Sequence, residues 1–497
     1  MKILTPGQMR EVDRLSTTPT LILMENAGMR VAEVLEDRFE NLDELTVAIL
    51  CGKGNNGGDG LVVARQLIQK GCFPFVFLFA SEEEVKGDAK INLDTLKGLG
   101  YPPTMVVSEQ DWAEERLELL DADIIVDALL GTGARQPVEG LYKTVIESLA
   151  EDFPRAEIVA VDVPSPGVQA EVTVTFTALK PSLVFYPDCE DAGDVILAEI
   201  GNNAGLLENE NYKLHLIEPH ELPARVADSN KGTYGRVLIV GGSRGKTGAA
   251  AMAGMAALRA GAGLVTVASA QSAIAEIAAH APELMTEPLR ETESGAIALN
   301  ANLRAIVEGK TVIAMGPGLG RYPQIATLVA SIAESVEVPL VLDADALEPV
   351  SAAPDRTRVL TPHPGEMARL TGKTTAEVQA DRICAARQYA AAHSVTLVLK
   401  GQRTVIAFPD GRVWINPTGT PALGTGGSGD ILTGLIAGLL AQFPGRTGEA
   451  VAAAVYLHGL AGEIGARTLG EKSLIATDLL RFLPAAMEEC ANVPHRL

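Results

Sequence analysis

Cysteine is scarce in this sequence. Only five of its 497 residues are cysteines, and no two of them have the Cys-x-x-Cys spacing of a thiolate metal site. Their scattered positions also argue against a disulfide framework. We therefore expect free thiols in a reducing cytoplasm at Cys51, Cys72, Cys189, Cys384 and Cys490.

Basic residues are outnumbered by acidic ones. The chain has 41 lysines and arginines against 63 aspartates and glutamates, which gives a net charge of -22. This balance argues against a protein that neutralises nucleic-acid phosphates. Small anionic ligands remain compatible with it, because local backbone dipoles can outweigh the field of the whole molecule.

Long apolar runs are also missing. The longest apolar helical candidate, residues 431–443, is shorter than the roughly 20 residues that a membrane span needs, so it is expected to be a core helix. The N-terminus lacks the basic-then-apolar pattern of a secretion signal, and Pro6 interrupts it. We expect a cytoplasmic protein that contacts no membrane.

Short apolar runs do alternate with stretches of helical period, in a chain with 47% hydrophobic residues. This alternation predicts an α/β fold with parallel sheets covered on both faces. The polar segment 208–231 interrupts it, so we place a junction near residue 220, between domains at 1–215 and 216–497. Residues 408–415, around Pro-Asp-Gly, predict a hairpin in the second domain. The predicted strands are 46–51, 74–79, 124–128, 158–161, 236–240, 264–268, 311–315, 340–342 and 396–399.

A glycine-rich loop, residues 52–60, follows the first predicted strand. It matches Gly-x-Gly-x-x-Gly and opens a helix that Asp59 can cap and Gly71 can end, as in dinucleotide-binding domains. Its two asparagines and its aspartate are unusual for a pure phosphate cradle, because their oxygens also suit a hard cation. A metal or a polar substrate is therefore plausible beside the phosphate.

Two more strands of the first half end in an aspartate, Asp127 and Asp162. The carboxyl ends of parallel strands share one edge of a sheet, where ligands bind in open α/β folds. We therefore expect these loops and the glycine loop to converge on one crevice.

The first half resembles the NAD(P)H-hydrate epimerase (YjeF N-terminal) domain over nearly all of residues 1–210, which implies a Rossmann-like three-layer αβα fold. The resemblance is carried by residues 23–28, 54–60, 127–137, 162–165 and 173–181. It implies potassium ligands at Asn56, Asp127 and Ser165, a catalytic proton-handling group at Asp162, and Lys180 as a polar neighbour. The substrate-binding residues that it implies are Asn55, Asn56, Gly57, Gly58, Asp59, Gly131, Thr132, Gly133, Ala134, Arg135, Gln136, Pro137 and Asp162.

The loop after Ser165 is shorter than the pattern of that family, because residues 166–170 run almost directly into the next strand. The shortening motivates an alternative in which the first domain is a non-catalytic dinucleotide-binding or scaffolding module. A Rossmann oxidoreductase is a further alternative. It is disfavoured because no acidic residue is convincingly placed at the end of the second strand.

The second half has two glycine-rich loops. Residues 241–248 are not a P-loop, because Val240 stands where the first glycine would be needed; a substrate-positioning loop is expected instead. Residues 424–430 precede the predicted core helix, whose N-terminal amides and dipole would favour a phosphoryl group. Asp430 at that helix start can take a proton from an attacking hydroxyl.

This half resembles the ribokinase-like superfamily, and more closely its ADP/ATP-dependent NAD(P)H-hydrate dehydratase branch. The supporting segments are residues 235–243, 247–249, 316–320, 341–347, 361–366, 400–404 and 424–430. The resemblance implies a ribokinase-like αβα fold, with Ala249, Gly318, His363 and the catalytic Asp430 contacting the hydrated nucleotide. It implies adenine-nucleotide binding by Lys400, Gly401, Gln402, Arg403, Thr404 and Gly429.

The two resemblances together imply a bifunctional repair enzyme. One domain would interconvert the R and S forms of hydrated NADH or NADPH, called NAD(P)HX. The other would dehydrate the S form with ADP or ATP, giving NAD(P)H and, from ADP, AMP and phosphate. Potassium, magnesium and the nucleotide are the expected cofactors, ADP is the expected donor, and a homo-oligomer is expected. A ribokinase-like vitamin kinase is the alternative for the second domain.

Overall fold

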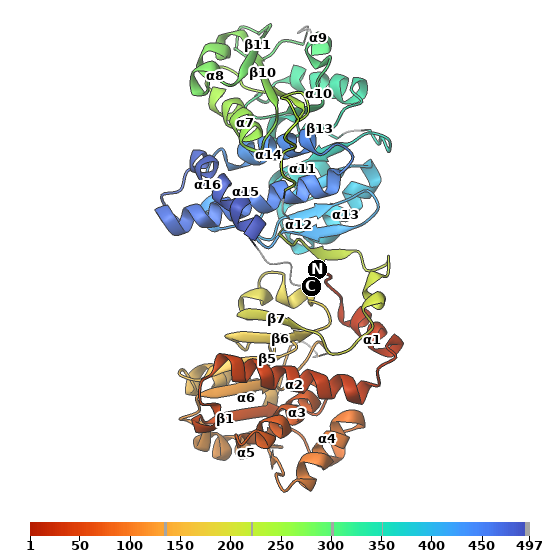
Figure 1. The fold of residues 1–497 in the computed structure, drawn as a ribbon, viewed down its shortest axis with the longest axis vertical. Coiled ribbons are helices and arrows are strands. Elements are labelled where there is room, and N and C mark those ends of the chain that lie inside the picture. Colours follow the sequence, from red (N-terminus) through yellow and green to blue (C-terminus); the bar gives the residue numbers. More distant parts are fainter. Residues whose placement is uncertain (134–136, 220–221, 300–302, 350, 493–497) are drawn as a thin grey trace. The chain divides into compact units, whose positions relative to one another are not determined.

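The computed structural model describes residues 1–133, 137–219, 222–299, 303–349 and 351–492. These residues form two compact units, Met1–Tyr212 and Lys213–Leu497. The division falls three residues before the expected boundary, because residues 214–216 form a strand of the second unit's sheet. Each unit contains its own sheet (Figure 1).

The first unit has a seven-stranded sheet in the order β3-β2-β1-β4-β5-β6-β7, in which every neighbouring pair is parallel. Its strands are β1 (Val47–Cys51), β2 (Phe75–Leu78), β3 (Thr104–Met105), β4 (Ile124–Ala128), β5 (Glu157–Val161), β6 (Val172–Phe176) and β7 (Asp194–Ala198). Its helices are α1 (Pro6–Leu15), α2 (Thr20–Arg38), α3 (Asn55–Gln69), α4 (Gly87–Gly98), α5 (Glu109–Glu115) and α6 (Leu141–Asp152).

Alternate residues of these strands face opposite sides of the sheet, and both sides are buried. Ile49 and Val126 join an apolar cluster with α2 and α3. Leu50 and Ile125 join a second cluster with α5 and α6. The first unit is therefore a three-layer αβα domain. Its chain order reverses between β1 and β4, which is where ligands bind in such folds.

The second unit has a ten-stranded sheet in the order β11-β10-β9-β12-β13-β14-β15-β16-β17-β8. Its strands are β8 (Leu214–Leu216), β9 (Arg236–Val240), β10 (Leu264–Ala270), β11 (Met285–Leu289), β12 (Val312–Met315), β13 (Leu340–Leu342), β14 (Arg358–Leu360), β15 (Thr396–Leu399), β16 (Val405–Ala407) and β17 (Val413–Ile415). The pairs β15–β16 and β16–β17 are antiparallel, so the predicted hairpin is confirmed.

Helices flank this sheet (Figure 1). They are α7 (Thr247–Arg259), α8 (Ile274–His280), α9 (Leu303–Val307), α10 (Pro323–Ser335), α11 (Pro364–Thr371), α12 (Thr375–Ala380), α13 (Arg382–His393), α14 (Ser428–Gln442), α15 (Thr447–Leu469) and α16 (Ala476–Asn492). All residues from Ile431 to Ala441 in α14 are buried, which confirms the predicted core helix. A Cβ atom at Gly434 would overlap the Ala253 carbonyl of α7, so this glycine permits the close approach of the two helices.

The five cysteines are free; Cys51, Cys72 and Cys490 are buried, and the other two are partly exposed. No helix in the described ranges is both long enough and apolar enough to cross a bilayer.

Candidate active sites

The glycine loop of the first unit starts α3 earlier than predicted. The helix begins at Asn55 with Gly54 as its N-cap, so the expectation that Asp59 caps it is wrong; Asp59 lies inside the helix. A Cβ atom at Gly57 would overlap the Gly52 carbonyl, so this first turn packs directly onto the end of β1. The close packing holds the helix N-terminus at the sheet edge, where its free amides can face a ligand.

Asp127 and Ser165 meet at this edge. The two Asp127 carboxylate oxygens accept hydrogen bonds from the Ser165 Oγ and the Ser165 amide, each at 2.7 Å. Burial raises the pKa of Asp127, and the bonds from Ser165 and Leu129 oppose that rise. The Ser165 Oγ also accepts a hydrogen bond from the Leu130 amide at 3.0 Å. The residue pair therefore ties the loop after β4 to the loop after β5.

Asn56 lies beside the loop that follows β4. Its side chain is 9% exposed, and both amide atoms are buried without a hydrogen-bond partner among the described residues. A Cβ atom built at Gly131 would lie 3.3 Å from the Asn56 Cβ, so the two residues are neighbours. A buried carboxamide without partners costs free energy unless a ligand satisfies it. Its oxygen is the kind of neutral ligand that a hard cation prefers.

An ion pair marks the end of the next strand. Asp162 has a left-handed backbone, with φ at 65°, and its carboxylate pairs with the Lys180 ammonium. Lys180 is buried and also donates to the Thr175 hydroxyl at 2.9 Å and to the Phe176 carbonyl at 2.8 Å. A non-glycine residue in this backbone region is uncommon and often occurs at functional sites.

Two more carboxyl groups belong to this cluster. Burial and the nearby Asp162 charge raise the pKa of Asp59 well above its usual value, although Lys180 opposes the rise. Burial likewise raises the pKa of Asp13, which comes from α1 and accepts a hydrogen bond from the Asn202 Nδ2 at 3.0 Å. Three carboxyl groups thus interact electrostatically with a single ammonium group. Such arrangements are typical of sites that move protons.

The substrate loop expected at residues 131–137 is described in part. Gly131 and Thr132 are partly buried, and Gly133 and Pro137 are exposed. Ala134, Arg135 and Gln136 lie outside the described residues.

In the second unit, the loop after β9 lies against the loop after β12. The Ser243 hydroxyl donates to the Gly318 carbonyl at 2.8 Å. Gly318 has φ at 67°, and a Cβ atom there would lie 3.1 Å from the Ala249 Cβ at the start of α7. The structure therefore brings the predicted residues Ala249 and Gly318 together.

The second glycine loop ends at α14. The helix begins at Ser428, with Gly427 as a left-handed N-cap at φ 97°, so Asp430 is in the first turn and is not the cap. A Cβ atom at Gly427 would lie 2.6 Å from the Met252 Cε of α7, which shows how closely the loop packs. The first-turn amides of a helix have no partner within the helix, so they are available to an anion.

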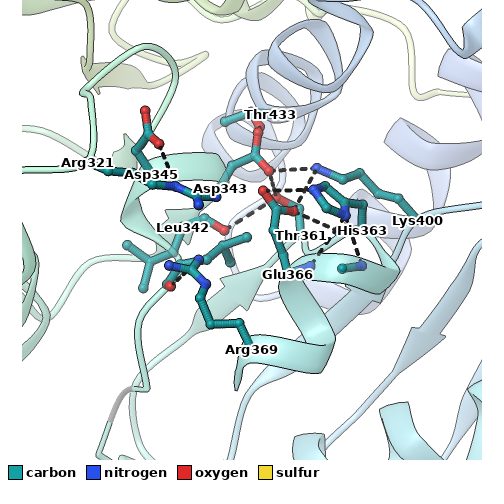
Figure 2. A network of polar contacts seen from close by, with 12 residues as sticks. Arg321, Leu342, Asp343, Asp345, Thr361, His363, Glu366, Arg369, Lys400 and Thr433 are labelled. Atoms are coloured by element: carbon teal, nitrogen blue, oxygen red, sulfur yellow. Dashed lines mark hydrogen bonds and ion pairs between the residues drawn. The ribbon is translucent and has the colours of Figure 1, made fainter. Parts of the chain in front are cut away.

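A buried network lies next to this turn, centred on Asp343 at the end of β13 (Figure 2). Asp343 is 1% exposed and accepts hydrogen bonds from the Lys400 Nζ at 2.8 Å, the Thr361 hydroxyl at 2.7 Å and the Thr433 hydroxyl at 2.8 Å. Burial alone would raise the pKa of Asp343, but the Lys400 charge and these bonds outweigh burial and lower that pKa. Asp343 is therefore an anion at neutral pH.

Lys400, at the end of β15, lies between carboxylates. Its Nζ is 3.9 Å from Glu366 Oε2 in addition to its bond with Asp343. Burial would lower the pKa of Lys400, but the charges of Asp343 and Glu366 raise it above the ordinary value. A Cβ atom at Gly429 would lie 3.4 Å from the Lys400 Nζ. The structure thus brings together two predicted nucleotide-binding residues, Lys400 and Gly429, at the start of α14.

Asp430 has the perturbed acidity expected of a general base. Burial is the main cause that raises its pKa to about 7, the charges of Asp343 and Asp345 add to the rise, and Lys400 opposes it. A base with a pKa near neutrality combines a useful ionised fraction with sufficient basicity.

His363 connects to the network through Glu366 (Figure 2). Its backbone amide donates to Glu366 Oε2 at 2.8 Å, and its Nδ1 accepts from the amides of Gly365 and Glu366. These bonds make His363 the N-cap of α11. Its imidazole is 55% exposed, with the Nε2 3.5 Å from Glu366 Oε1. The side chain therefore has a structural bond on one nitrogen and solvent access at the ring.

The predicted nucleotide segment 400–404 is a tight turn. Gly401 has φ at 142° and Arg403 has φ at 51°. Arg382 of α13 donates to the carbonyls of Gln402 and Leu399 and so braces the turn. The Thr404 hydroxyl donates back to the Gly401 carbonyl at 3.0 Å.

Comparison with known proteins identifies both units. The profile of the NAD(P)H-hydrate dehydratase family matches residues 237–485, and that of the YjeF-related protein N-terminus matches residues 20–182. A bifunctional NAD(P)H-hydrate repair enzyme of Moorella thermoacetica is 43% identical over 97% of this chain and 96% of its own length. The chain belongs to the family of bifunctional NAD(P)H-hydrate repair enzymes. The family member of Escherichia coli is 35% identical over 93% of this chain and 88% of its own.

The fold of the second unit has a solved counterpart in the family. An ADP/ATP-dependent NAD(P)H-hydrate dehydratase of Bacillus subtilis, co-crystallised with ATP and Mg²⁺, is 38% identical. It covers 54% of this chain and 95% of its own, with a TM-score of 0.50. The α/β class and the order of a Rossmann-like domain before a ribokinase-like domain are therefore confirmed.

Three residues of these sites carried no signal in the sequence. Asp13 lies in the first helix, far along the chain from the glycine loop. Arg382 lies in an ordinary helical stretch. His458, in α15, is buried with its Nε2 2.9 Å from the Ser428 carbonyl. Each reaches its site through tertiary packing, which a local sequence motif does not predict.

Proposed function

We propose that this chain repairs hydrated NADH and NADPH. The first unit interconverts the R and S forms of NAD(P)HX. The second unit dehydrates the S form at the expense of ADP or ATP, and with ADP it yields NAD(P)H, AMP and phosphate. The observation that carries the proposal is the Asp430 carboxyl group. It lies in the first turn of α14 beside Lys400, and its pKa is raised to about 7. A stereospecific dehydratase needs an epimerase to use both forms, which explains the fusion.

The dehydration starts from a poor leaving group. Hydration places a hydroxyl on C6 of the nicotinamide ring, and hydroxide leaves with difficulty. Asp430 takes the hydroxyl proton while the oxygen attacks the terminal phosphoryl group of the nucleotide. The amides of residues 426–429 stabilise the charge that develops on that group. Phosphate then leaves C6 and a proton leaves C5, which restores the dihydronicotinamide.

The chain's own residues divide between the two ligands. Ala249, Gly318 and His363 contact the hydrated nucleotide together with Asp430. The turn of Lys400, Gly401, Gln402, Arg403 and Thr404 binds the adenine nucleotide with Gly429. Within the described ranges, no cluster of three or more histidine, cysteine, aspartate or glutamate side chains forms a metal cage. Mg²⁺ would enter with the nucleotide as the counter-ion of its phosphates, which is its usual form in such enzymes.

In the first unit, Asp162 handles the proton. C6 carries both the hydroxyl and the ring nitrogen N1, so moving one proton from oxygen to N1 allows the C6–N1 bond to open to an aldehyde. Reclosure on the other face gives the other epimer. Asn55, Asp59 and the loop from Gly131 to Pro137 hold the substrate over the β1–β4 edge.

A potassium ion fits the residues at this edge. The unpartnered carboxamide of Asn56 and the buried oxygens of Asp127 and Ser165 would hold it. K⁺ would supply positive charge that orders the loops after β4 and β5. We also propose that the protein is a cytoplasmic homo-oligomer.

The test is to incubate the purified chain with both epimers, Mg²⁺, K⁺ and either nucleotide, and to follow dihydronicotinamide absorbance. Complete conversion of the mixture supports both activities. Conversion of the S form alone would indicate that the first domain is not catalytic. No conversion with either nucleotide contradicts the proposal. An Asp430→Asn variant should retain nucleotide binding and lose turnover.

A further inference from the structure

Helix α15 contacts the segment that precedes the glycine loop 424–430. The Thr418 hydroxyl donates to the Tyr456 carbonyl at 2.8 Å, and the Gly419 amide donates to Glu463 Oε1 at 2.7 Å. A Cβ atom at Gly459 would overlap Thr418, so the helix backbone lies directly against this preceding segment. The segment that leads into the glycine loop is thus held by α15.

His458 connects α15 to the first turn of α14, which contains Asp430. Its Nε2 is 2.9 Å from the carbonyl oxygen of Ser428, the first residue of α14. A carbonyl oxygen only accepts hydrogen bonds, so this nitrogen must carry the proton. Burial lowers the pKa of His458 to about 4, with Lys400 adding to the fall and the Ser428 bond opposing it. The imidazole is therefore neutral under ordinary conditions, with Nε2 protonated and Nδ1 bare.

The Ser428 carbonyl shares one planar peptide unit with the Gly429 amide. Within this plane the C=O and the N–H point in opposite directions, so a bond that fixes the carbonyl also fixes the amide. Ser428 itself is held by its hydroxyl, which donates to the Leu423 carbonyl at 2.7 Å. The Gly429 amide is in the first helical turn, where it has no partner within the helix.

We propose that His458 is a positioning residue of the dehydratase site: its Nε2–H holds the Ser428 carbonyl and so aims the Gly429 amide at the nucleotide phosphate. The inference rests on the proposed function of the second unit, since that function places the phosphate at Gly429. His458 touches neither ligand. It acts through one peptide plane, and it neither gains nor loses a proton in the reaction.

Substitutions can separate this role from simple packing. His458→Gln retains an amide donor at about the reach of Nε2, whereas His458→Asn places its donor nearer the backbone, at about the reach of Nδ1. His458→Leu removes the donor and keeps an apolar side chain. Val451→Ala, on the same helix two turns earlier, removes buried apolar atoms and serves as the packing control.

The full-length variants are compared by calorimetric Kd for Mg²⁺–ATP, by steady-state kinetics and by Tm. We expect His458→Leu and His458→Asn to weaken nucleotide affinity and kcat/KM by about tenfold or more, because small misplacements of binding groups are costly. The KM for the hydrate should change by less than about threefold, since the Leu and Asn variants leave that part of the site intact. His458→Gln should restore nucleotide affinity.

Unchanged nucleotide affinity in His458→Leu would overturn the inference, and so would an equal loss in Val451→Ala or a Gln variant as defective as the Leu variant. The measurement of nucleotide affinity does not depend on turnover of the hydrate. A wild-type chain that binds nucleotide but does not dehydrate the hydrate contradicts the proposed function, while the effect on Kd still decides the role of His458.

Discussion

At the scale of single residues, the proposed dehydratase site depends on the charges around Asp430. The anionic Asp343 and Asp345 disfavour the ionised form of Asp430, the Lys400 ammonium favours it, and burial disfavours it further. Glu366 also pairs with Lys400, and the neutral His458 contacts the first turn of α14. The acidity of Asp430 is thus set by several elements together.

Asp343→Asn should shift the pH dependence of dehydration. A negative neighbour raises the pKa of a carboxyl group, so removing it lowers the pKa of Asp430 and moves the acid limb of kcat/KM to lower pH. We expect a shift of about half a pH unit or more, with a lower maximal rate because the base is weaker. Thr433→Val removes one hydrogen bond to Asp343 and retains the charge. It should leave the acid limb in place, and an equal shift in both variants would contradict this explanation.

At pH values where Asp430 is ionised, it should also lower the stability of the folded state. Its pKa in the folded state, about 7, is above its value in the unfolded chain, so the folded state loses relative stability as pH rises between those two values. Asp430→Asn should therefore raise Tm at pH values above about 7 and leave Tm nearly unchanged near pH 4. A difference in Tm that does not depend on pH would refute the assignment.

In the first unit, Lys180 is the only basic side chain that the structure shows paired with Asp162 in the described residues. Lys180→Met leaves a largely buried carboxylate without its partner, so epimer exchange should fall by about a hundredfold or more. Lys53→Met removes an exposed lysine of the glycine loop, which pairs with Glu84. The rate of epimer exchange, monitored by chromatography of the two epimers, should be nearly normal in that variant. Equal losses of exchange in the two variants would contradict a role for Lys180 in the site.

Sequence motifs predicted many of the residues that meet at these sites, including Asp127 with Ser165 and Lys400 with Gly429. Asp127, Ser165 and Lys400 lie at or just after strand ends, and a parallel sheet places strand ends at one edge. Gly429 lies in the first turn of α14. Asp13, Arg382 and His458 could not be predicted, because they reach the sites from the sides of helices. The structure also shows that Nδ1 of His363 caps α11.

At the scale of elements, both functional helices begin in glycine-rich turns. The sequence suggested starts at Asp59 and Ile431, whereas α3 begins at Asn55 and α14 at Ser428. Glycine has a low helix propensity, so a prediction from sequence pattern and propensity places the helix start after the glycines, too late in the chain. Tertiary packing reverses this preference, because the small residues fit where the helix meets the end of a strand or another helix.

Gly57→Ala should test this packing. A Cβ atom there would overlap the backbone carbonyl of Gly52, which cannot move without displacing the end of β1. We expect a loss of about 1–3 kcal/mol in the free energy of unfolding of the first unit, measured by urea denaturation. Gly54→Ala meets no atom within 4 Å and is the matched control, expected to be nearly neutral. Equal effects of the two substitutions would contradict the packing argument.

At the scale of the whole molecule, the chain is two units with separate cores. The division lies between Tyr212 and Lys213, although composition placed it near residue 220. The difference arises because β8 is short and polar on its flanks, yet it pairs with β17 and completes the second sheet. A local sequence pattern cannot predict such pairing between strands that are far apart in the chain.

Excised fragments should reflect this division. Residues 1–212 should fold alone and exchange epimers, because their core is complete. A fragment of residues 213–497 should have a higher Tm than one of residues 218–497, which lacks β8 and exposes the edge of β17. Equal Tm values would show that β8 adds nothing to the second unit.

In the proposed dehydration, the hydroxyl oxygen on C6 attacks the nucleotide's terminal phosphoryl group with Asp430 as the base. The most direct measurement uses substrate labelled with heavy oxygen in that hydroxyl and analyses the products by mass spectrometry. We expect the label to appear in inorganic phosphate, with no stable phosphate ester accumulating. Label found in water, or retained in a phosphorylated product, would contradict it.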